Sequence, residues 1–310
     1  MANLKELTHR EDRLAGGHRL CAGCGASIAV RQVLLGAGED PVVVGCATGC
    51  LEVSTTIYPY SSWKTPFIHN AFENSAATIS GVEAAFNGLR RAGKIDPDKK
   101  VRFVAFGGDG GTYDIGLQSL SGAMERGHDM VYVCYDNGAY MNTGIQRSSA
   151  TPKGAWATTS EVGSAQAGKQ QRRKDLTAII AAHGVPYAAQ ASISHWKDLT
   201  TKAEKAFNTP GPAFLNVFAP CPRGWRTPSS KTVEIAKLAV QTGFWPVYEV
   251  EDGVWRQTVK VANRKPIEEF LKPQGRFKHL FAPGNEELLA EIQSDVDRAW
   301  DALMVRCSAE

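Results

Sequence analysis

Two cysteines form a C-x-x-C pair in the segment HRLCAGCGAS, and thiols at this spacing are a metal-binding or redox element. Cys21 and Cys24 supply two thiolates, and Cys50 and Cys221 follow apolar runs later in the chain. In a reducing compartment such a pair favours metal or redox chemistry over a structural disulfide. Four thiolates suit either zinc or an iron–sulfur cluster, and the spacing alone leaves both open.

A second group of residues could hold a divalent cation and a diphosphate. Asp109 lies between Gly108 and Gly110 in FGGDGGTYD, and Asn137 lies in YDNGAYMNTG; each segment follows an apolar run. A carboxylate and an amide oxygen would hold magnesium, which neutralises a diphosphate, while the glycines let backbone N–H groups approach it. The arrangement resembles the GDG…N motif of enzymes that use thiamine diphosphate.

The elements that must position these residues alternate along the chain. Apolar runs predict strands and the stretches between them predict helices. We expect strands at residues 41–47, 101–108, 130–137, 186–193 and 213–220, and helices at 73–93, 115–127, 173–184 and 195–209. This alternation predicts an α/β fold with a doubly wound, mostly parallel sheet. We expect residues 1–230 to form the cofactor-binding domain and residues 231–310 to form a C-terminal extension that contacts partner subunits.

The loops after four of these strands carry the chemistry. GCATGC follows the first strand, GGDGGTYD the second, DNGAYMNTG the third and APCPRGW the last. Ligands of an open parallel sheet gather beyond the carboxyl ends of its strands, so we expect the four loops to face one crevice. Oxidation of a thiamine adduct needs an electron acceptor nearby. A thiolate site beside a thiamine site therefore favours an iron–sulfur cluster over a structural zinc ion.

Seven segments together resemble the beta subunit of 2-oxoacid:ferredoxin oxidoreductases of the pyruvate synthase type. They are CAGCGAS, GCATGC, TTIYPY, FGGDGGTYDIG, YDNGAYMNTGIQRS, ATPKGA and PCPRGW, and the resemblance covers residues 14–255. It implies a thiamine-diphosphate-binding fold and a [4Fe–4S] cluster. The cluster ligands that it implies are Cys21, Cys24, Cys50 and Cys221.

The same resemblance implies the remaining site residues. Magnesium would be held by Asp109, Asn137 and the carbonyl of Ala139. Asn142 would donate a hydrogen bond to the oxygen that gains charge during the reaction, with a turn-forming role as the alternative. The other cofactor contacts would be Gly108, Gly110, Gly111, Tyr140, Thr143 and Thr48.

Three cysteines are expected to lie outside the cluster site. Cys46 competes with Cys50, but it ends an apolar run and is better interpreted as a small buried hydrophobe. Cys134, in VYVCY, is expected in the core of a strand. Cys307, near a polar C-terminus, is expected to have no role.

The resemblance implies an enzyme that cleaves a small 2-oxoacid with thiamine diphosphate. Pyruvate would yield acetyl-CoA and carbon dioxide, and the electrons would pass through the cluster to ferredoxin. Oxalate, cleaved without coenzyme A in a branch of the family, is one alternative. A catalytically inactive, zinc-stabilised binding subunit is an alternative of another class.

Part of a thiamine site is missing from the chain. In the family, a glutamate in a separate pyrimidine-binding domain activates the aminopyrimidine, and no segment here resembles that domain. We therefore expect a larger subunit with that domain, a subunit with ferredoxin-like clusters, and ferredoxin as partners. Glu52, His69, Glu73 and Asn74 are candidates for the pocket wall, although Glu73 and Asn74 could equally open a helix.

Composition excludes several other classes of protein. The 310 residues are 43% hydrophobic and carry a formal charge of only +3, which gives no overall field for nucleic acid. The densest basic run, GKQQRRKD at 168–175, is expected to be a solvated loop or an interface. No apolar run is long enough for a membrane span, and the charged N-terminus does not resemble a signal peptide. We expect a cytoplasmic protein without a membrane or nucleic-acid partner.

Overall fold

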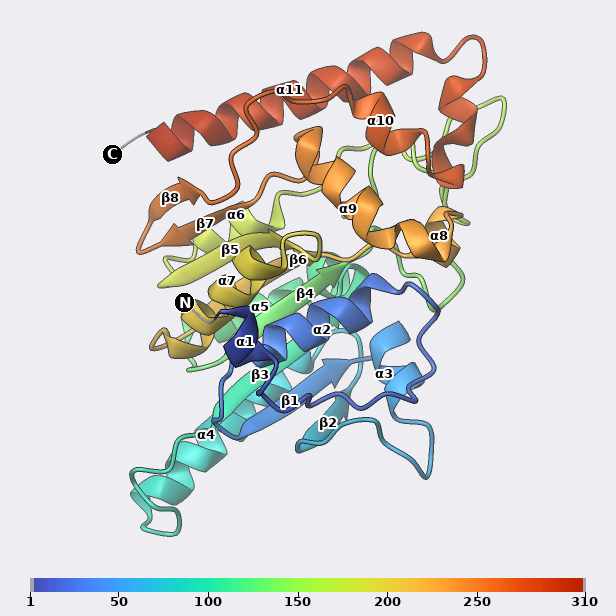
Figure 1. The fold of residues 1–310 in the computed structure, drawn as a ribbon. Coiled ribbons are helices and arrows are strands. Elements are labelled where there is room, and N and C mark those ends of the chain that lie inside the picture. Colours follow the sequence, from blue (N-terminus) through green and yellow to red (C-terminus); the bar gives the residue numbers. More distant parts are fainter. Residues whose placement is uncertain (1–2, 309–310) are drawn as a thin grey trace.

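An eight-stranded sheet with helices on both faces is the centre of the computed structural model, which describes residues 3–308 (Figure 1). The strand order is β2-β1-β3-β4-β6-β5-β7-β8, and every pairing from β2 to β5 is parallel, whereas β7 and β8 pair antiparallel. The expected doubly wound, mostly parallel α/β sheet is confirmed. The strands are β1 (Val42–Ala47), β2 (Phe67–Asn70), β3 (Arg102–Gly108), β4 (Val131–Asp136), β5 (Tyr187–Ser192), β6 (Ala213–Phe218), β7 (Tyr248–Glu251) and β8 (Val254–Gln257).

The helices between the strands form two layers. Those with an α-helical backbone are α1 (Leu4–Leu7), α2 (Gly25–Leu35), α3 (Cys50–Thr55), α4 (Ser75–Arg91), α5 (Leu117–Glu125), α6 (Leu176–Ala181), α7 (Trp196–Asn208), α8 (Pro222–Trp225), α9 (Thr232–Gln241), α10 (Ile267–Leu271) and α11 (Glu286–Ser308). A π-helix, η1 (Gly111–Ile115), precedes α5, and two 3₁₀ helices, η2 (Ser229–Lys231) and η3 (Gly275–Phe281), flank α9 and α10.

Alternating side chains of each strand separate the core into two parts, because successive residues of a strand point to opposite faces of the sheet. Val104 and Phe106 of β3 pack into the cluster that includes residues of α2, α7 and α9. Phe103 and Ala105 of the same strand pack into the cluster that includes residues of α4, α5 and α6. The central strands are thus buried on both faces, as continuous apolar runs predict.

The C-terminal residues extend the same sheet instead of folding apart from it. β7 and β8 continue the sheet beyond β5, and α11 crosses over that side of the molecule, red in Figure 1. α11 buries one apolar stripe, Ile292, Val296, Trp300 and Leu303. Within residues 3–308, no helix combines the length and the apolar character needed to cross a bilayer.

Candidate active site

Four adjacent parallel strands carry the four chemistry-bearing loops. β1, β3, β4 and β6 lie side by side in the sheet order, and their loops begin with Thr48, Asp109, Asn137 and Ala219. Parallel strands end at the same edge, so the glycine-rich loops after β3 and β4 lie between the two cysteine-bearing loops after β1 and β6. In Figure 1 the helices α3 and α8, which follow the cysteine-bearing loops, lie at this same edge of the sheet.

A cavity opens at this edge. Its wall includes ten residues that the sequence predicted for the site: Thr48, Cys50, Gly108, Gly110, Gly111, Asn137, Ala139, Tyr140, Asn142 and Thr143. Four wall residues were not predicted: Gly49, Phe72, Tyr135 and Met141. Asp109 lies directly behind the wall and is fully buried.

The oxygens around Asn137 have the spacing of magnesium ligands. One arm of its side-chain amide lies 2.9 Å from the Ala139 carbonyl oxygen and 2.9 Å from Asp109 Oδ1. As an NH₂ group this arm donates to both oxygens, and as the amide oxygen it would be a third oxygen beside them. An octahedral magnesium ion, with Mg–O distances of about 2.1 Å, places neighbouring ligand oxygens about 3 Å apart. The donor set therefore fits this ion.

Hydrogen bonds hold the Asp109 carboxylate in place. Ser148 Oγ donates to Asp109 Oδ2 at 2.5 Å, and the backbone N–H of Asn137 donates to Oδ1 at 3.2 Å. Burial, and then the charge of Asp136, raises the pKa of Asp109 to about 8. A cation beside this carboxylate would stabilise its ionised form, because an opposite charge nearby lowers the pKa of an acid.

Two glycines of the β3 loop are required by close packing. A Cβ on Gly110 would lie 2.4 Å from the ring of Tyr140, whose hydroxyl donates to the Gly110 carbonyl at 2.7 Å. A Cβ on Gly111 would lie 2.8 Å from the carbonyl oxygen of Phe72. Only glycine fits at these positions, so the backbone of the β3 loop is bare where it faces the cavity.

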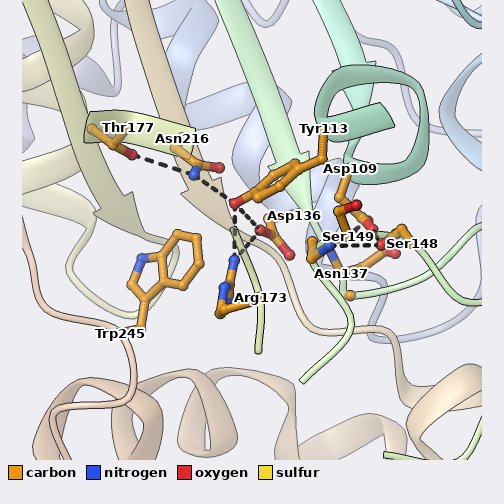
Figure 2. A network of polar contacts seen from close by, with 12 residues as sticks. Asp109, Tyr113, Asp136, Asn137, Ser148, Ser149, Arg173, Thr177, Asn216 and Trp245 are labelled. Atoms are coloured by element: carbon orange, nitrogen blue, oxygen red, sulfur yellow. Dashed lines mark hydrogen bonds and ion pairs between the residues drawn. The ribbon is translucent and has the colours of Figure 1, made fainter. Parts of the chain in front are cut away.

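A buried polar network lies behind the Asn137 loop (Figure 2). Asp136 Oδ2 accepts from the Tyr113 hydroxyl at 2.6 Å and from Arg173 Nη2 at 2.5 Å. Arg173 also donates to the Tyr113 oxygen at 2.9 Å, and Asn216 Nδ2 donates to the same oxygen at 2.9 Å. The guanidinium carbon of Arg173 lies 4.6 Å from the ring centre of Trp245. The network fixes the strand end that presents Asn137.

Most of the basic run at 168–175 is exposed, as expected for a solvated loop or an interface, but two of its cations are largely buried. The side chain of Arg173 is 19% exposed, and Lys169 is 1% exposed. Lys169 Nζ donates to the Thr151 carbonyl at 2.6 Å, in the loop that also carries Ser148. Partners from distant strands and loops bury these cations, and local composition does not reveal such partners.

The four predicted cluster ligands gather beside the cavity. Cys50 begins α3, and Cys24 and Cys221 are the N-caps of α2 and α8. Burial and, to a smaller extent, the neighbouring thiols, Cys21 and Cys221 among them, together raise the pKa of Cys24 to about 11 and that of Cys50 to about 12. Among residues 3–308, no three His, Cys, Asp or Glu side chains lie close enough to hold one metal ion.

Hydrogen bonds join the N-terminal segment that carries Cys24 to the segment that carries Cys221. The N–H of Gly25 donates to the Pro220 carbonyl at 3.0 Å, next to Cys24 and Cys221. Thr232 Oγ1 donates to the Gly23 carbonyl at 2.5 Å. The N-terminal C-x-x-C segment is thus attached directly to the loop that follows β6.

The remaining cysteines lie elsewhere. Cys46 is fully buried in β1 within the apolar core, and Cys134 is fully buried in β4. Cys307 lies near the end of α11 and packs beside the small cluster around Tyr248. The Cys50 thiol instead faces the cavity wall, where its Sγ lies 3.8 Å from Asn142 Oδ1.

The other candidates for the pocket wall do not line this cavity: Glu52, His69, Glu73 and Asn74. Glu52 lies 3.4 Å from His69 Nδ1 and faces that ring. Asn74 occupies the N-cap position of α4, directly after Glu73, without a side-chain capping bond. The wall residue that this segment supplies is Phe72.

Comparison with known proteins gives a matching picture. Residues 43–217 match the family described as thiamine pyrophosphate enzyme, C-terminal TPP binding domain. The pyruvate synthase subunit PorB of Thermotoga maritima is 56% identical over 97% of this chain and 95% of its own length. The PorB subunit of Methanocaldococcus jannaschii is 54% identical over 93% of this chain and 95% of its own length. The ketoisovalerate oxidoreductase subunit VorB of Pyrococcus abyssi is 45% identical over 94% of this chain and 93% of its own length.

A solved structure agrees on the fold. The 2-oxoglutarate:ferredoxin oxidoreductase from Magnetococcus marinus superposes with a TM-score of 0.55 at 21% identity, over 73% of this chain and 79% of that one. Sheet, cavity and family match together define a thiamine-diphosphate-binding enzyme domain. More narrowly, the chain belongs to the beta-subunit family of the 2-oxoacid:ferredoxin oxidoreductases of the pyruvate synthase type. It is accordingly a subunit of an oxidoreductase that acts on 2-oxoacids.

Proposed function

We propose that the chain is the thiamine-diphosphate- and cluster-binding subunit of an enzyme that oxidises pyruvate. Pyruvate, coenzyme A and two oxidised ferredoxins would give acetyl-CoA, carbon dioxide, a proton and two reduced ferredoxins. The observation that carries the proposal is the position of Cys50, which belongs both to the four-thiol group and to the cavity wall. An electron acceptor held there lies beside the place where electrons are released.

Different residues around the cavity would bind the metal ion, the diphosphate and the rest of the cofactor. Asp109, Asn137 and the Ala139 carbonyl would hold magnesium, and the backbone around Gly110 and Gly111 would approach the diphosphate. Thiamine diphosphate, when bound, supplies the electron sink that decarboxylation of a 2-oxoacid requires. Thr48, Tyr140 and Thr143 lie in the cavity wall and would contact the cofactor.

Asn142 would stabilise charge in the reaction. Its side chain is exposed within the cavity wall and lies beside the Cys50 thiol. An amide N–H placed there would donate to the substrate oxygen that becomes negative when the keto carbon is attacked. The pyruvate assignment follows the more similar relatives, which are pyruvate synthase subunits, whereas the ketoisovalerate relative is less similar.

We propose a [4Fe–4S] cluster at Cys21, Cys24, Cys50 and Cys221 instead of zinc. Zinc holds four thiolates about 2.3 Å from one point, whereas a four-iron cluster separates its ligands by its own width. The four thiols are near enough to influence one another electrostatically, and beside a thiamine site a cluster can accept electrons, which zinc cannot do.

The cysteine assignment can be tested one residue at a time. Cys50→Ser should remove most of the iron and the iron–sulfur absorbance, whereas Cys46→Ser, which alters a core side chain, should retain both. Cys21→Ser, Cys24→Ser and Cys221→Ser should behave like Cys50→Ser. Full iron in Cys50→Ser together with loss in Cys46→Ser would reverse the assignment, and zinc in place of iron after anaerobic purification would favour the inactive binding subunit.

We further propose that the active enzyme is a hetero-oligomer. The relatives are named as subunits, and the chain spans 95% of the length of the first two. A larger subunit would supply the pyrimidine-binding domain with its glutamate, and another would carry ferredoxin-like clusters that lead to ferredoxin. Residues 1–230 would bind the cofactors, and the extension at 231–310 would meet a neighbour through exposed positions such as Val305, which is 69% exposed.

A substrate panel on the assembled complex tests the function. Pyruvate should support viologen or ferredoxin reduction that depends on coenzyme A, and the chain alone, with cluster and thiamine diphosphate supplied, should be inactive. Oxalate and a branched 2-oxoacid serve as competitors. Coenzyme-A-independent activity with oxalate would overturn the pyruvate assignment, and turnover by the chain alone would overturn the hetero-oligomer.

A further inference from the structure

The Tyr135 hydroxyl is a buried polar group in the cavity wall that has no partner. The residue is 2% exposed, and its oxygen makes no hydrogen bond to any described part of the chain. Tyr132, three positions earlier in β4, differs in this respect. Its hydroxyl lies on the opposite face of the sheet, 3.1 Å from Thr112 Oγ1. The same strand thus carries one satisfied and one unsatisfied tyrosine.

Two glycines place the Tyr135 hydroxyl at the cavity. Its ring extends from β4 across Gly108, where a Cβ would lie 3.4 Å from the ring and from the hydroxyl oxygen. The hydroxyl reaches the loop after β1, where a Cβ on Gly49 would lie 2.8 Å from it. Gly49, Gly108 and Tyr135 all belong to the cavity wall. The hydroxyl therefore lies between the Asp109 loop and the Cys50 loop.

An unpaired buried hydroxyl is uncommon because folding removes it from water without replacing the lost hydrogen bond. In the wall of a cofactor cavity, a bound molecule is the natural partner. Thiamine diphosphate brings negatively charged oxygens to this cavity, and a hydroxyl donor forms its stronger hydrogen bonds with such acceptors. The Cys50 thiol, which also belongs to the cavity wall, faces Asn142 Oδ1 at 3.8 Å.

We propose that the Tyr135 hydroxyl donates a hydrogen bond to an anionic oxygen in the loaded cavity, as a second donor beside Asn142. The inference rests on the proposed function, because that function brings the oxygen. The oxygen belongs either to the diphosphate, which is present throughout, or to the substrate keto group, which becomes negative only during the reaction.

Tyr135→Phe tests the proposal, since it removes the hydroxyl and keeps the ring. Tyr132→Phe is the matched control on the same strand. Both variants are assembled with the partner subunits, and the affinity for thiamine diphosphate with magnesium is measured by equilibrium dialysis. The affinity for methyl acetylphosphonate, a pyruvate analogue that is not decarboxylated, is measured by calorimetry, and the unfolding midpoint is recorded.

The two sources of the oxygen give different results. A diphosphate acceptor predicts that Tyr135→Phe weakens thiamine diphosphate binding by about 10-fold or more, as loss of a hydrogen bond to a charged group does. A substrate acceptor predicts unchanged cofactor binding, with weaker analogue binding and lower kcat by about 10-fold. Tyr132→Phe should change neither affinity.

Three outcomes would overturn the inference. The first is Tyr135→Phe with wild-type affinities for cofactor and analogue. The second is equal losses in both tyrosine variants, which would indicate a packing effect. The third is a shifted cluster midpoint potential at unchanged affinities, which would assign the hydroxyl to the Cys50 sulfur. Failure of the wild-type complex to bind thiamine diphosphate would instead overturn the proposed function.

Discussion

The cofactor cavity and the region under α11 belong to the same sheet, but they differ in how their polar groups are paired. At the cavity, the Tyr135 hydroxyl is unpaired, and one arm of the Asn137 amide lies against two oxygens, those of Ala139 and Asp109. Under α11, apolar side chains such as Trp300 are buried, and charges are paired, as in Arg264 with Asp297 at 2.7 Å. The first region leaves polar groups available to a ligand, whereas the second buries apolar side chains and pairs charged ones.

This difference separates two kinds of substitution. A change at the cavity should alter binding or turnover more than the free energy of unfolding, because the groups there contribute little to the fold by themselves. A change under α11 should do the reverse, because burial of apolar surface is its contribution. Four substitutions, taken from the largest expected effect on function to the smallest, test this division.

Asp109→Ala should have the largest effect. Without the carboxylate, the proposed magnesium ion would lose its charged protein ligand, and the diphosphate would lose the ion that neutralises it. We expect thiamine diphosphate affinity to fall by more than about 100-fold, since even residues that only orient metal ligands contribute about 10–100-fold. Equilibrium dialysis measures it, with Asp301→Ala, on the exposed side of α11, as the control. Retained affinity would mean that magnesium binds elsewhere.

Asn142→Ala should separate catalysis from binding. If its amide stabilises developing charge, kcat should fall by about 100-fold while thiamine diphosphate affinity stays within about 2-fold. Steady-state kinetics of the complex, together with dialysis, give both values. A similar loss of affinity and turnover would leave Asn142 only a turn-forming role.

Arg173→Met tests the boundary between the two regions. The substitution leaves Asp136 buried without its cation, so the strand end that presents Asn137 should shift. We expect magnesium-dependent cofactor affinity to fall by about 10-fold, as for residues that orient metal ligands. Arg172→Met is the control, because that side chain is 60% exposed and pairs with Asp295. Identical cofactor affinities in the two variants would mean that the Asp136 network does not position the cofactor site.

Trp300→Ala should have the smallest effect on function. Truncation of this buried indole should lower the free energy of unfolding by about 3 kcal/mol, with cofactor affinity unchanged within about 2-fold. Denaturant unfolding and dialysis provide the two values. Val305→Ala, at an exposed position of the same helix, should alter neither. Loss of cofactor binding in Trp300→Ala would show that the cavity and the region under α11 are not independent.

The sequence predicted the parts of the molecule whose cause is local. Five apolar runs predicted β1, β3, β4, β5 and β6, and the motifs that resemble the family predicted ten residues of the cavity wall. The short edge strand β2 has only four residues and gives little periodic signal. The hairpin of β7 and β8 has a local signal in its Asp-Gly turn, where Asp252 and Gly253 have positive φ, but no hairpin was predicted there.

The missed site residues depend on contacts distant in sequence. Arg173 was interpreted as part of a basic run because its partner Asp136 lies in another element. Tyr135 lies in an apolar strand, and alternation shows that it faces away from Tyr132, but not which face opens into a cavity. Composition and periodicity describe a residue's own segment, whereas both roles depend on what the fold places opposite.

The attachment of the C-x-x-C segment to the loop after β6 has a consequence for biosynthesis. Gly25 and Pro220 are hydrogen-bonded although they lie far apart in the chain, and Gly23 contacts Thr232 still later. Such non-local contacts form late, because the chain between them must first be made and folded. For the proposed cluster, iron delivered during translation would find the thiols of Cys21, Cys24 and Cys50 without that of Cys221. We therefore expect that these three cysteines must stay reduced until the ribosome has completed most of the chain.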